Sequence, residues 1–358
     1  MIIDRYIMRE IFKPTVTICS VLMFIFGCYI SARYLEDAVQ GQLPGSTVIL
    51  LILLRITIAL EVLLPTTLYL SVVIALGRLY RDTEITAMFA CGISMARVLK
   101  SVFFVSIIVG VIVACLSLYI RPWAWGQFFG LKAQAKANFD MTRMKGGNFY
   151  EIENGKRVIF ADKVDNQKNR AKGVFIQTKR DDNLQIIYSK QAKQYTDDTT
   201  GKPILVLHDG YLYEFYRFDK EGRILEFENF AMHLEHEDVM QPEYKVKAAS
   251  TEHLAHSNNI EEIAELQWRL AAPLSTILLA LLGVPLSRSS PRQGKYSKVT
   301  MAVLIFAVYY NLSAMTKKWV GQGVVDTIPG IWWVQMLLAG LLMVLLWRPH
   351  LLFRWRNR

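Results

Sequence analysis

The sequence predicts an α-helical membrane protein with six transmembrane helices and an all-β domain inserted between the third and the fourth. Three observations lead to this fold class. Hydrophobic residues make up 53% of the 358-residue chain and the mean hydropathy is +0.24, although 20% of the residues are charged. Several apolar runs approach the ~20 residues that a bilayer-crossing helix needs. One long polar stretch instead alternates apolar and polar residues, as half-buried strands do.

The six spans are read from the apolar runs, which lie near residues 14–33, 56–77, 98–120, 269–287, 299–316 and 331–347. The first run is not a cleaved signal peptide, because its charged region is long, includes Asp4 and Glu10, and no small-residue cleavage pattern follows. We predict an uncleaved first span preceded by a short amphipathic helix. Arg55 and Glu61 interrupt the second run, so its first part, from Val48, is predicted to be an interfacial or pre-span helix.

The basic residues predict the orientation, because cytoplasmic flanks carry the excess of Lys and Arg. With both termini in the cytoplasm, the outer flanks and spans hold only Arg33, Arg55, Arg269, Lys317 and Lys318. The inner flanks hold Arg5, Arg9, Lys13, Arg78, Arg81, Arg97, Lys100, Arg288, Arg292, Lys295, Lys298, Arg348, Arg354, Arg356 and Arg358. The predicted domains are therefore helices 1–3 over residues 1–120, an outer domain over 121–268, and helices 4–6 over 269–358.

The charge of the chain belongs to the membrane flanks. Between Arg121 and Trp268 there are 21 basic and 23 acidic residues, so the remainder carries more positive charge than the chain's net +10. This distribution gives no basic surface for nucleic acid.

The outer insert is predicted to begin with a short helix over residues 128–142 and to continue as strands. Six alternating runs begin at Gly147, Lys156, Gly173, Leu184 and Pro203, and finally at Arg223, with turn sequences such as "ENGK", "RDDN" and "DKEG" between them. Antiparallel strands at this spacing favour a small sandwich or a jelly-roll-like domain.

The chain carries no signature of an enzyme. It has no phosphate-binding loop, dinucleotide fingerprint, nucleophile elbow or H-E-x-x-H motif. Its four cysteines show no metal-ligand spacing. His233 and His236, beside Glu235 and Glu237, are better explained as a solvated strand end than as a metal site. Glu61 inside an apolar run is either functional or close to the outer interface.

The segment "RDTEITAMFACGIS" on the cytoplasmic side predicts a short helix over about residues 82–92. Asp82 or Thr83 can act as N-cap, and Glu84 then lies in the first turn, where a carboxylate suits the helix dipole. Ile85, Met88 and Phe89 share one apolar face, Gly92 ends the helix, and Ser94 can cap the next one. Such a helix either lies on the bilayer surface or docks a cytoplasmic partner.

Three stretches resemble a known family: "LGRLYRDTEITAMFACGIS" after the second span, "AELQWRLAAPLS" into the fourth, and "VPLSRSSPRQGKY" after it. They are similar to the LptF/LptG permease family of the lipopolysaccharide-transport ABC exporter, and the likeness covers essentially the whole chain. "MIIDRYIMREI", "EITAMFACG" and "PRQG" are closer to the F subunit of that family than to its G paralogue.

The resemblance implies a permease subunit that helps to extract lipopolysaccharide from the bacterial inner membrane and passes it through a periplasmic β-jellyroll towards the outer membrane. The implied partners are the paralogous G permease, a cytoplasmic ATPase dimer, a periplasmic bridge protein, a single-span C subunit and lipopolysaccharide itself. ATP and Mg²⁺ would bind the ATPase, so the chain is expected to hold no cofactor and no catalytic residue of its own.

The resemblance also implies roles for particular residues. The segment over 82–92 would be the coupling helix, with Glu84 at the acidic position expected to pair with a basic ATPase residue. The remaining coupling residues are then Thr83, Ile85, Met88, Phe89 and Gly92. Since spans 1 and 5 form the lateral gate in the family, Arg33, Lys317 and Lys318 become candidate ligands of lipid A phosphates, and Arg55 and Arg269 are hypotheses.

From the residues alone, contact of those five outer basics with ordinary lipid headgroups is favoured over a cationic rim that binds one anionic lipid, and only the resemblance reverses this preference at Arg33, Lys317 and Lys318. Tyr29, Ile30 and Tyr34 lie where family members can carry more basic residues, so headgroup binding would rely more on Arg33 and on the partner subunit. In the β-domain, Phe160, Phe175, Tyr213 and Phe215 are candidates for contact with acyl chains. The rival functions are a permease for another lipid or lipoprotein, and a membrane-anchored protein whose insert binds a partner.

Overall fold

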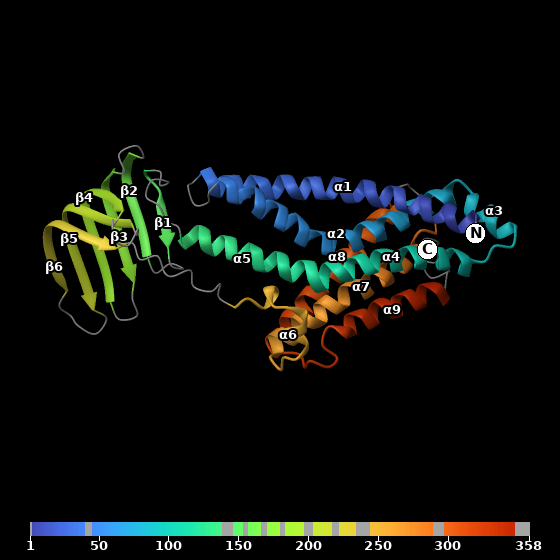
Figure 1. The fold of residues 1–358 in the computed structure, drawn as a ribbon. Helices are drawn as coiled ribbons and strands as arrows, with labels where there is room; N and C mark the ends of the chain where they lie inside the picture. Colours follow the sequence, from blue (N-terminus) through green and yellow to red (C-terminus); the bar gives the residue numbers. More distant parts are fainter. Residues whose placement is uncertain are drawn as a thin grey trace, which may run out of the picture. The chain divides into compact units, whose positions relative to one another are not determined.

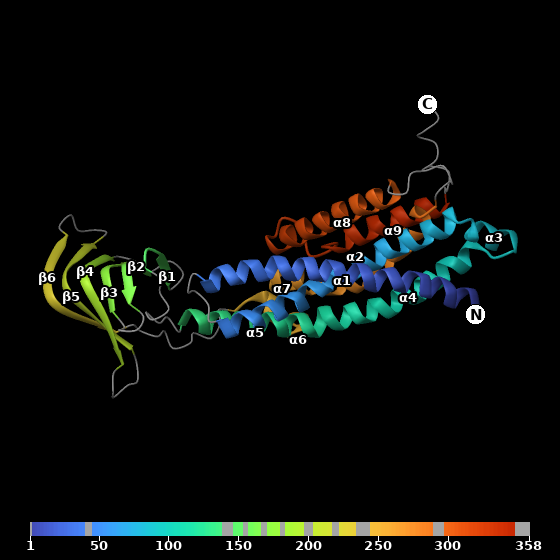
Figure 2. The same ribbon diagram turned by 90° about the horizontal axis from the view of Figure 1, so that it is seen from above.

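The computed structural model describes residues 2–39, 45–137, 146–152, 157–165, 170–179, 183–196, 203–216, 222–233, 244–288 and 297–347 (Figures 1 and 2). The chain divides into two compact units. One comprises residues 1–28, 54–127 and 244–358, and the other comprises residues 29–53 and 128–243. The first is helical, and the second contains a β-sheet together with the adjoining ends of three helices.

The helices account for most of the described residues. They are α1 (Ile2–Val39), α2 (Gly45–Arg81), α3 (Glu84–Ala90), α4 (Met95–Cys115), the π-helix η1 (Leu116–Ile120), α5 (Arg121–Ala137), the 3₁₀-helix η4 (Val246–Ala248), α6 (Thr251–Ala255), α7 (Ile260–Leu286), α8 (Ser297–Gly321) and α9 (Trp332–Trp347).

Five helical segments of the described chain are long and apolar enough to cross a membrane: residues 2–36, 47–81, 95–134, 260–286 and 298–321. The sixth predicted span corresponds to α9, which has 16 residues, fewer than the ~20 that a full crossing needs. The structure therefore supports a helical membrane protein, and the predicted count of six spans is not confirmed.

Three predicted breaks are absent from the helices. The amphipathic segment and the first span form one continuous helix, α1, with Pro14 inside it. The predicted pre-span helix from Val48 is likewise part of α2, which continues through Arg55 and Glu61. The described part of the short helix predicted over 128–142 is the end of α5, which follows α4 and η1 without interruption, and residues 138–142 lie outside the described residues. Apolar packing on both sides of a polar residue holds a helix together where sequence polarity suggests a break.

The core of the helical unit lies where α2, α4 and α7 meet, with the start of α1 against them. Leu68 and Val72 of α2, Val102 of α4 and Val284 of α7 are buried in one cluster. Gly283 permits this packing, because a Cβ atom there would lie 2.9 Å from a side-chain atom of Val72.

The second unit contains one six-stranded antiparallel sheet in which neighbours in sequence are neighbours in space, in the order β1 to β6. The strands are β1 (Phe149–Ile152), β2 (Arg157–Asp165), β3 (Arg170–Lys179), β4 (Asn183–Thr196), β5 (Pro203–Tyr216) and β6 (Arg223–His233). All six lie where the alternation predicts strands. This connectivity is a meander. No second sheet occurs among the described strands, so the sandwich or jelly-roll prediction is not confirmed.

The two faces of the sheet differ. One face carries the buried cluster, with Ile159, Ile176, Ile187 and Leu212 in one row across neighbouring strands. The opposite face carries an aromatic row, which consists of Phe149, Phe160, Phe175, Tyr188 and Tyr211. Tyr213 and Phe215 share this second face, because side chains two residues apart on a strand point the same way. All four candidates for acyl-chain contact thus lie on the aromatic face.

Some predictions fall outside the described residues. Glu235, His236 and Glu237 are among them, as is the "PRQG" segment at residues 291–294. The basic residues of the C-terminal flank from Arg348 onwards also lie outside.

Candidate functional site: a short exposed helix and a buried ion cluster

The predicted cytoplasmic helix is α3, which begins at Glu84 and ends at Ala90. Gly92 adopts a φ of +84°, and the N–H groups of Gly92 and Ile93 donate to the carbonyls of Phe89 and Met88, each at 3.0 Å. This pair of hydrogen bonds is a Schellman motif, which ends a helix with a glycine in the left-handed region. The predicted glycine stop is therefore present.

The predicted side-chain caps are not made. Thr83 is the N-cap of α3, but its φ of 60° lies in the left-handed region and its side chain caps no backbone N–H. Its hydroxyl donates to the carbonyl of Asp82 at 2.7 Å instead. Ser94 also occupies the N-cap position of α4 without a side-chain cap bond. The tight turn between α2 and α3 fixes the backbone of Thr83 in this conformation. A sequence pattern does not show that conformation.

One side of α3 faces the bundle and the other is open. Ile85 is fully buried in the core cluster, Met88 is half-buried, and Phe89 is exposed. The predicted apolar face is thus divided between packing and an accessible aromatic side chain. The carboxylate of Glu84 is half-buried and accepts a hydrogen bond from the hydroxyl of Tyr6 on α1 at 2.8 Å.

The start of α1 is held to the helices on both sides of α3. Arg78, near the end of α2, forms an ion pair with Glu10. Ser101 on α4 donates to Asp4 at 3.0 Å. Together with the Tyr6–Glu84 bond, these contacts tie the first turns of α1 to α2, α3 and α4.

A second polar feature is buried within the helical unit. Five charged side chains from four helices form one ion cluster: Glu61 (α2), Arg121 (α5), Glu265 and Arg269 (α7), and Lys317 (α8). Arg121 pairs with Glu61 and with Glu265, each at 3.0 Å, and Arg269 Nε lies 3.3 Å from Glu265. Lys317 also pairs with Glu265. Buried charges at this depth need such partners, because an unpaired one is costly.

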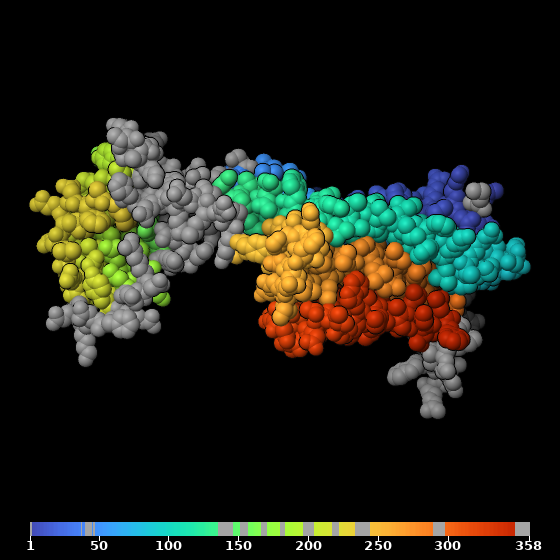
Figure 3. Space-filling view, turned by 60° about the horizontal axis from the view of Figure 1, so that its bottom comes forward, coloured from blue at the N-terminus to red at the C-terminus, as the bar shows by residue number. Residues whose placement is uncertain are grey.

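Local backbone features bring these side chains together. The π-helix η1 adds an irregular turn between α4 and α5, next to Arg121, and its Ser117 donates to Glu61 at 2.7 Å. Single-turn π-helices of this kind often occur at functional positions. Arg269 is capped from the other side, since it donates to Thr251 at 3.0 Å and to the carbonyl of Lys247 at 3.2 Å. Residues 244–259, light orange in Figure 3, form the surface patch that supplies these two acceptors.

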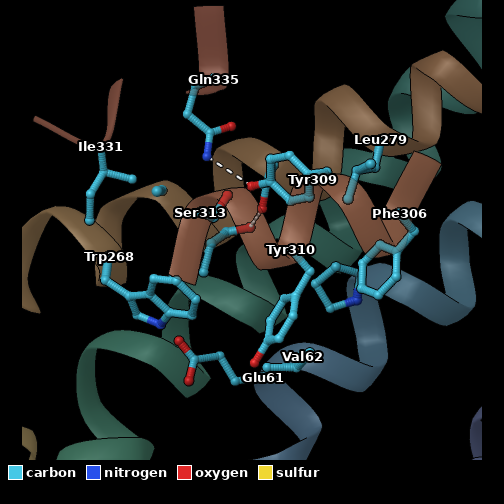
Figure 4. A pocket seen from close by; sticks show the side chains of 14 residues that line it. Glu61, Val62, Trp268, Leu279, Phe306, Tyr309, Tyr310, Ser313, Ile331 and Gln335 are labelled. Carbon is cyan, nitrogen blue, oxygen red and sulfur yellow. Dashed lines mark hydrogen bonds between the residues drawn. The ribbon is translucent and has the colours of Figure 1, made fainter. Parts of the chain in front are cut away.

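A pocket adjoins the cluster between α2, α7, α8 and α9. Glu61, Trp268 and Tyr310 lie towards one end in Figure 4, and the amide of Gln335 donates to Tyr309 at 2.9 Å towards the other. The walls are mainly apolar and aromatic. Ser313 Oγ and Gln335 Oε1 are buried polar atoms with no hydrogen-bond partner among the described residues.

The five outer basic residues predicted from sequence occupy different settings. Arg33 and Lys318 are exposed, and Arg33 belongs to the second unit. Arg55 is half-buried, with its guanidinium 5.0 Å from the ring of Trp125. Arg269 has no accessible surface, and the side chain of Lys317 keeps 23% of its surface. The structure therefore joins Arg269 and Lys317 in one cluster.

Two members of the cluster were missed in the sequence. Glu265 precedes Arg269 by four residues, which is the spacing of neighbours on a helix face, and this signal was available. Arg121 was counted only as the first residue of the outer insert. Its pairing with Glu61 and Glu265 joins positions 60 and 144 residues apart, and no local pattern predicts it.

Comparison with known proteins decides the family. The family model described as "Lipopolysaccharide export system permease LptF/LptG" matches residues 5–348. The chain belongs to the LptF/LptG family. It is 29% identical over 351 residues to the "Lipopolysaccharide export system permease protein LptF" of Escherichia coli (strain K12), with 97% of this chain and 95% of the relative covered. The proteins of the same name from Escherichia coli O157:H7 and Shigella flexneri match with the same identity and coverage.

The resemblance drawn from the coupling-helix and fourth-span motifs is thereby confirmed. The chain is an LptF-like transmembrane permease of the lipopolysaccharide export system. Membership in the family does not by itself assign roles to Glu84, Arg33 or the ion cluster, and these remain predictions.

Proposed function

We propose that this chain is the F-type permease subunit of an ABC exporter that extracts lipopolysaccharide from the bacterial inner membrane. A separate ATPase dimer supplies the energy and holds the ATP and Mg²⁺. The paralogous G permease completes the transmembrane part, and a single-span C subunit and a periplasmic bridge protein receive the lipid. Both termini face the cytoplasm and the β-domain faces the periplasm.

The observation that carries this proposal is the environment of α3. The helix is packed on the bundle through Ile85, while Phe89 is exposed and Glu84 is only half-buried. A helix that merely rested on the bilayer would present an unbroken apolar face to lipid. An accessible aromatic ring beside an acidic group suits a protein groove with a basic residue.

The test is purification of the full chain with its co-expressed neighbours. Glu84→Ala is expected to reduce recovery of the ATPase or to uncouple ATP hydrolysis from lipid release, because the predicted ion pair is lost. Asp82→Ala is the matched control, since Asp82 is an exposed carboxylate two residues away. If Glu84→Ala leaves both complex formation and ATP-driven lipid release unchanged, the docking role of α3 is wrong. A chain that is stable and always solitary would also count against transport.

The outer basic residues are proposed to hold the lipid. Arg33, Lys317 and Lys318 are the candidates for contact with lipid A phosphates, with Arg55 as a further one. Arg269 is better placed to support Lys317 through Glu265, because its own guanidinium is buried. Arg33→Glu combined with Lys317→Glu is expected to weaken cross-linking of lipopolysaccharide to the chain, whereas Lys100→Glu on the predicted inner flank should not. Undiminished cross-linking in an intact complex would exclude this role.

The aromatic face of the sheet is the proposed route for acyl chains. Phe160 and Phe175 are half-buried neighbours on adjacent strands, and Tyr188, Tyr211 and Phe215 on the same face are exposed. A photo-cross-linking residue in place of Phe215 should capture lipopolysaccharide during ATP-driven transport. The same residue in place of Lys190, an exposed side chain in the middle of β4, measures whether capture depends on the aromatic row.

A further inference from the structure

The ion cluster contains more cations than carboxylates. Arg121, Arg269 and Lys317 share Glu61 and Glu265, so the five side chains carry a net charge of +1 when all are ionised. Glu265 is the centre of the arrangement, because all three cations pair with it. One cation could therefore leave and still give a neutral cluster.

Lys317 is the cation held least firmly. Arg121 and Arg269 keep 8% and 0% of their side-chain surface, against 23% for Lys317. Each guanidinium makes several polar contacts, whereas the contacts described for the Lys317 ammonium are Glu265 and the ring of Trp268, 5.1 Å away. Arg121 and Lys247 lie close enough to repel it.

Departure of Lys317 leaves no buried charge unpaired. Glu265 would still hold Arg121 at 3.0 Å and Arg269 at 3.3 Å, and Glu61 would still hold Arg121. The severe cost of breaking a buried ion pair arises when one partner is left behind without compensation. That cost is avoided here, because Glu265 has two further cations.

We propose that a lipid phosphate replaces Glu265 as the partner of the Lys317 ammonium during transport. The competition between this phosphate and the Glu265 carboxylate selects the lipid. The inference rests on the proposed role of Lys317 as a phosphate ligand. A phosphate monoester carries a charge of about −1.5 to −2 and three strong acceptor oxygens, so it can draw the ammonium away from a carboxylate of charge −1. A zwitterionic phospholipid balances its phosphate with its own cation and competes poorly.

The exchange has a mechanical consequence. The Lys317–Glu265 pair joins α8 to α7, so transfer of Lys317 to a phosphate removes an ionic link between these helices. Glu265 is therefore a positioning and specificity-determining residue. It holds Lys317 in place until a sufficiently charged headgroup arrives, and binding of that headgroup frees α8.

The experiment measures the α7–α8 separation while lipid is added. The full chain, in complex with its co-purified partners, is placed in phosphatidylcholine nanodiscs. Cys19, Cys28, Cys91 and Cys115 are replaced by alanine, and spin labels are attached at Leu270→Cys on α7 and Met315→Cys on α8, both exposed positions. Pulsed electron spin resonance records distances with phosphorylated lipid A, with the same lipid lacking phosphates, and with inorganic phosphate.

Phosphorylated lipid A is expected to lengthen the distance in the parent, and the other two additions are not. Lys317→Met should show a broad or lengthened α7–α8 distance distribution before lipid is added. Its apparent affinity for the lipid should fall at least about tenfold, because a charge-assisted contact with the phosphate is lost. Lys100→Met, at an exposed position on the predicted inner flank, should behave like the parent. Glu265→Gln, if it folds, should also show the lengthened distribution before lipid is added, and it should cross-link to phosphorylated lipid A at a lower lipid concentration, because Lys317 then has no competing carboxylate.

Several outcomes would overturn the inference. An unchanged lipid response in Lys317→Met shows that Lys317 is not the exchanging group. A response to inorganic phosphate at the same concentration shows that the source of the phosphate is not a lipid. If lipid A cross-links to the parent but the α7–α8 distance does not change, the exchange is wrong and the proposed function stands. If lipid A does not bind the parent complex, the proposed function itself is wrong.

Discussion

The substitution Glu265→Gln removes the central negative charge of the ion cluster and almost nothing else, because glutamine has the same shape as glutamate. Three buried cations would then face Glu61 alone. Glu265 would lose its pairing with Arg121 at 3.0 Å, with Arg269 at 3.3 Å, and with Lys317. Removing one partner of a buried ion pair costs roughly 3–5 kcal/mol.

The expected loss can be converted to a melting temperature. Domains of 150–250 residues lose about 2–4 °C for each kcal/mol, so a loss of roughly 3–5 kcal/mol predicts a fall of at least about 6 °C. The measurement is a thermal melt of the purified complex in detergent. The control is Glu261→Gln on the same helix, which is exposed and should stay within about 2 °C of the parent, as surface substitutions do.

A second variant tests the charge count directly. In Glu265→Gln the cluster carries one anion and three cations, and adding Lys317→Met lowers that excess. The double variant should therefore recover part of the lost melting temperature, although each single change removes a contact. Such non-additivity is expected of residues in one network. If Glu265→Gln melts with the control, or if the double variant is less stable than the sum of the single changes, the reasoning from charge balance is refuted.

Three further predictions concern other parts of the fold. Tyr6→Phe removes the hydroxyl that donates to Glu84 and should lower ATP-driven lipid release at unchanged expression, as measured on reconstituted complexes; equal release would mean that this bond does not position Glu84. Gly92→Ala should destabilise the end of α3 by about 1 kcal/mol because φ is +84°, and ATPase recovery in a pull-down should fall, with Ala90→Gly as a comparison at the same helix end. Gly210→Ala should disrupt the sheet, because its Cβ would lie 2.2 Å from the carbonyl oxygen of Tyr188; a rise in limited proteolysis within residues 146–233 checks this, and unchanged digestion would contradict it.

Local patterns predicted the elements of this chain well. The alternation of apolar and polar residues located all six strands, since period-2 burial is a local property of each strand. The short helix α3 was located by Gly92, whose positive φ is a conformation that glycine adopts without strain. The arrangement of the strands was not predictable in the same way, because a meander and a jelly-roll can be built from the same six runs.

The contacts between distant residues could not be read from the sequence. Thr83 and Ser94 look like capping residues, but neither side chain makes a cap, and the backbone of Thr83 lies in the left-handed region. Arg269 and Lys317 look like independent outer cations until Glu265 is placed between them. Glu84 acquires an internal partner in Tyr6, 78 residues earlier in the chain. Each of these depends on which helices are neighbours.

The ties between the start of α1 and the helices around α3 bear on how a movement of α3 would spread through the helical unit. A push on α3 reaches α2 and α4 through the chain itself, since α3 is connected to both. It also reaches α1, through Tyr6, Glu10 and Asp4, although α1 is not adjacent to α3 in sequence. Because α1 runs unbroken for 38 residues, roughly 57 Å at 1.5 Å per residue, any displacement of its first turns would act on a helix longer than the ~30 Å hydrocarbon core of a bilayer, and three helices rather than two would carry it.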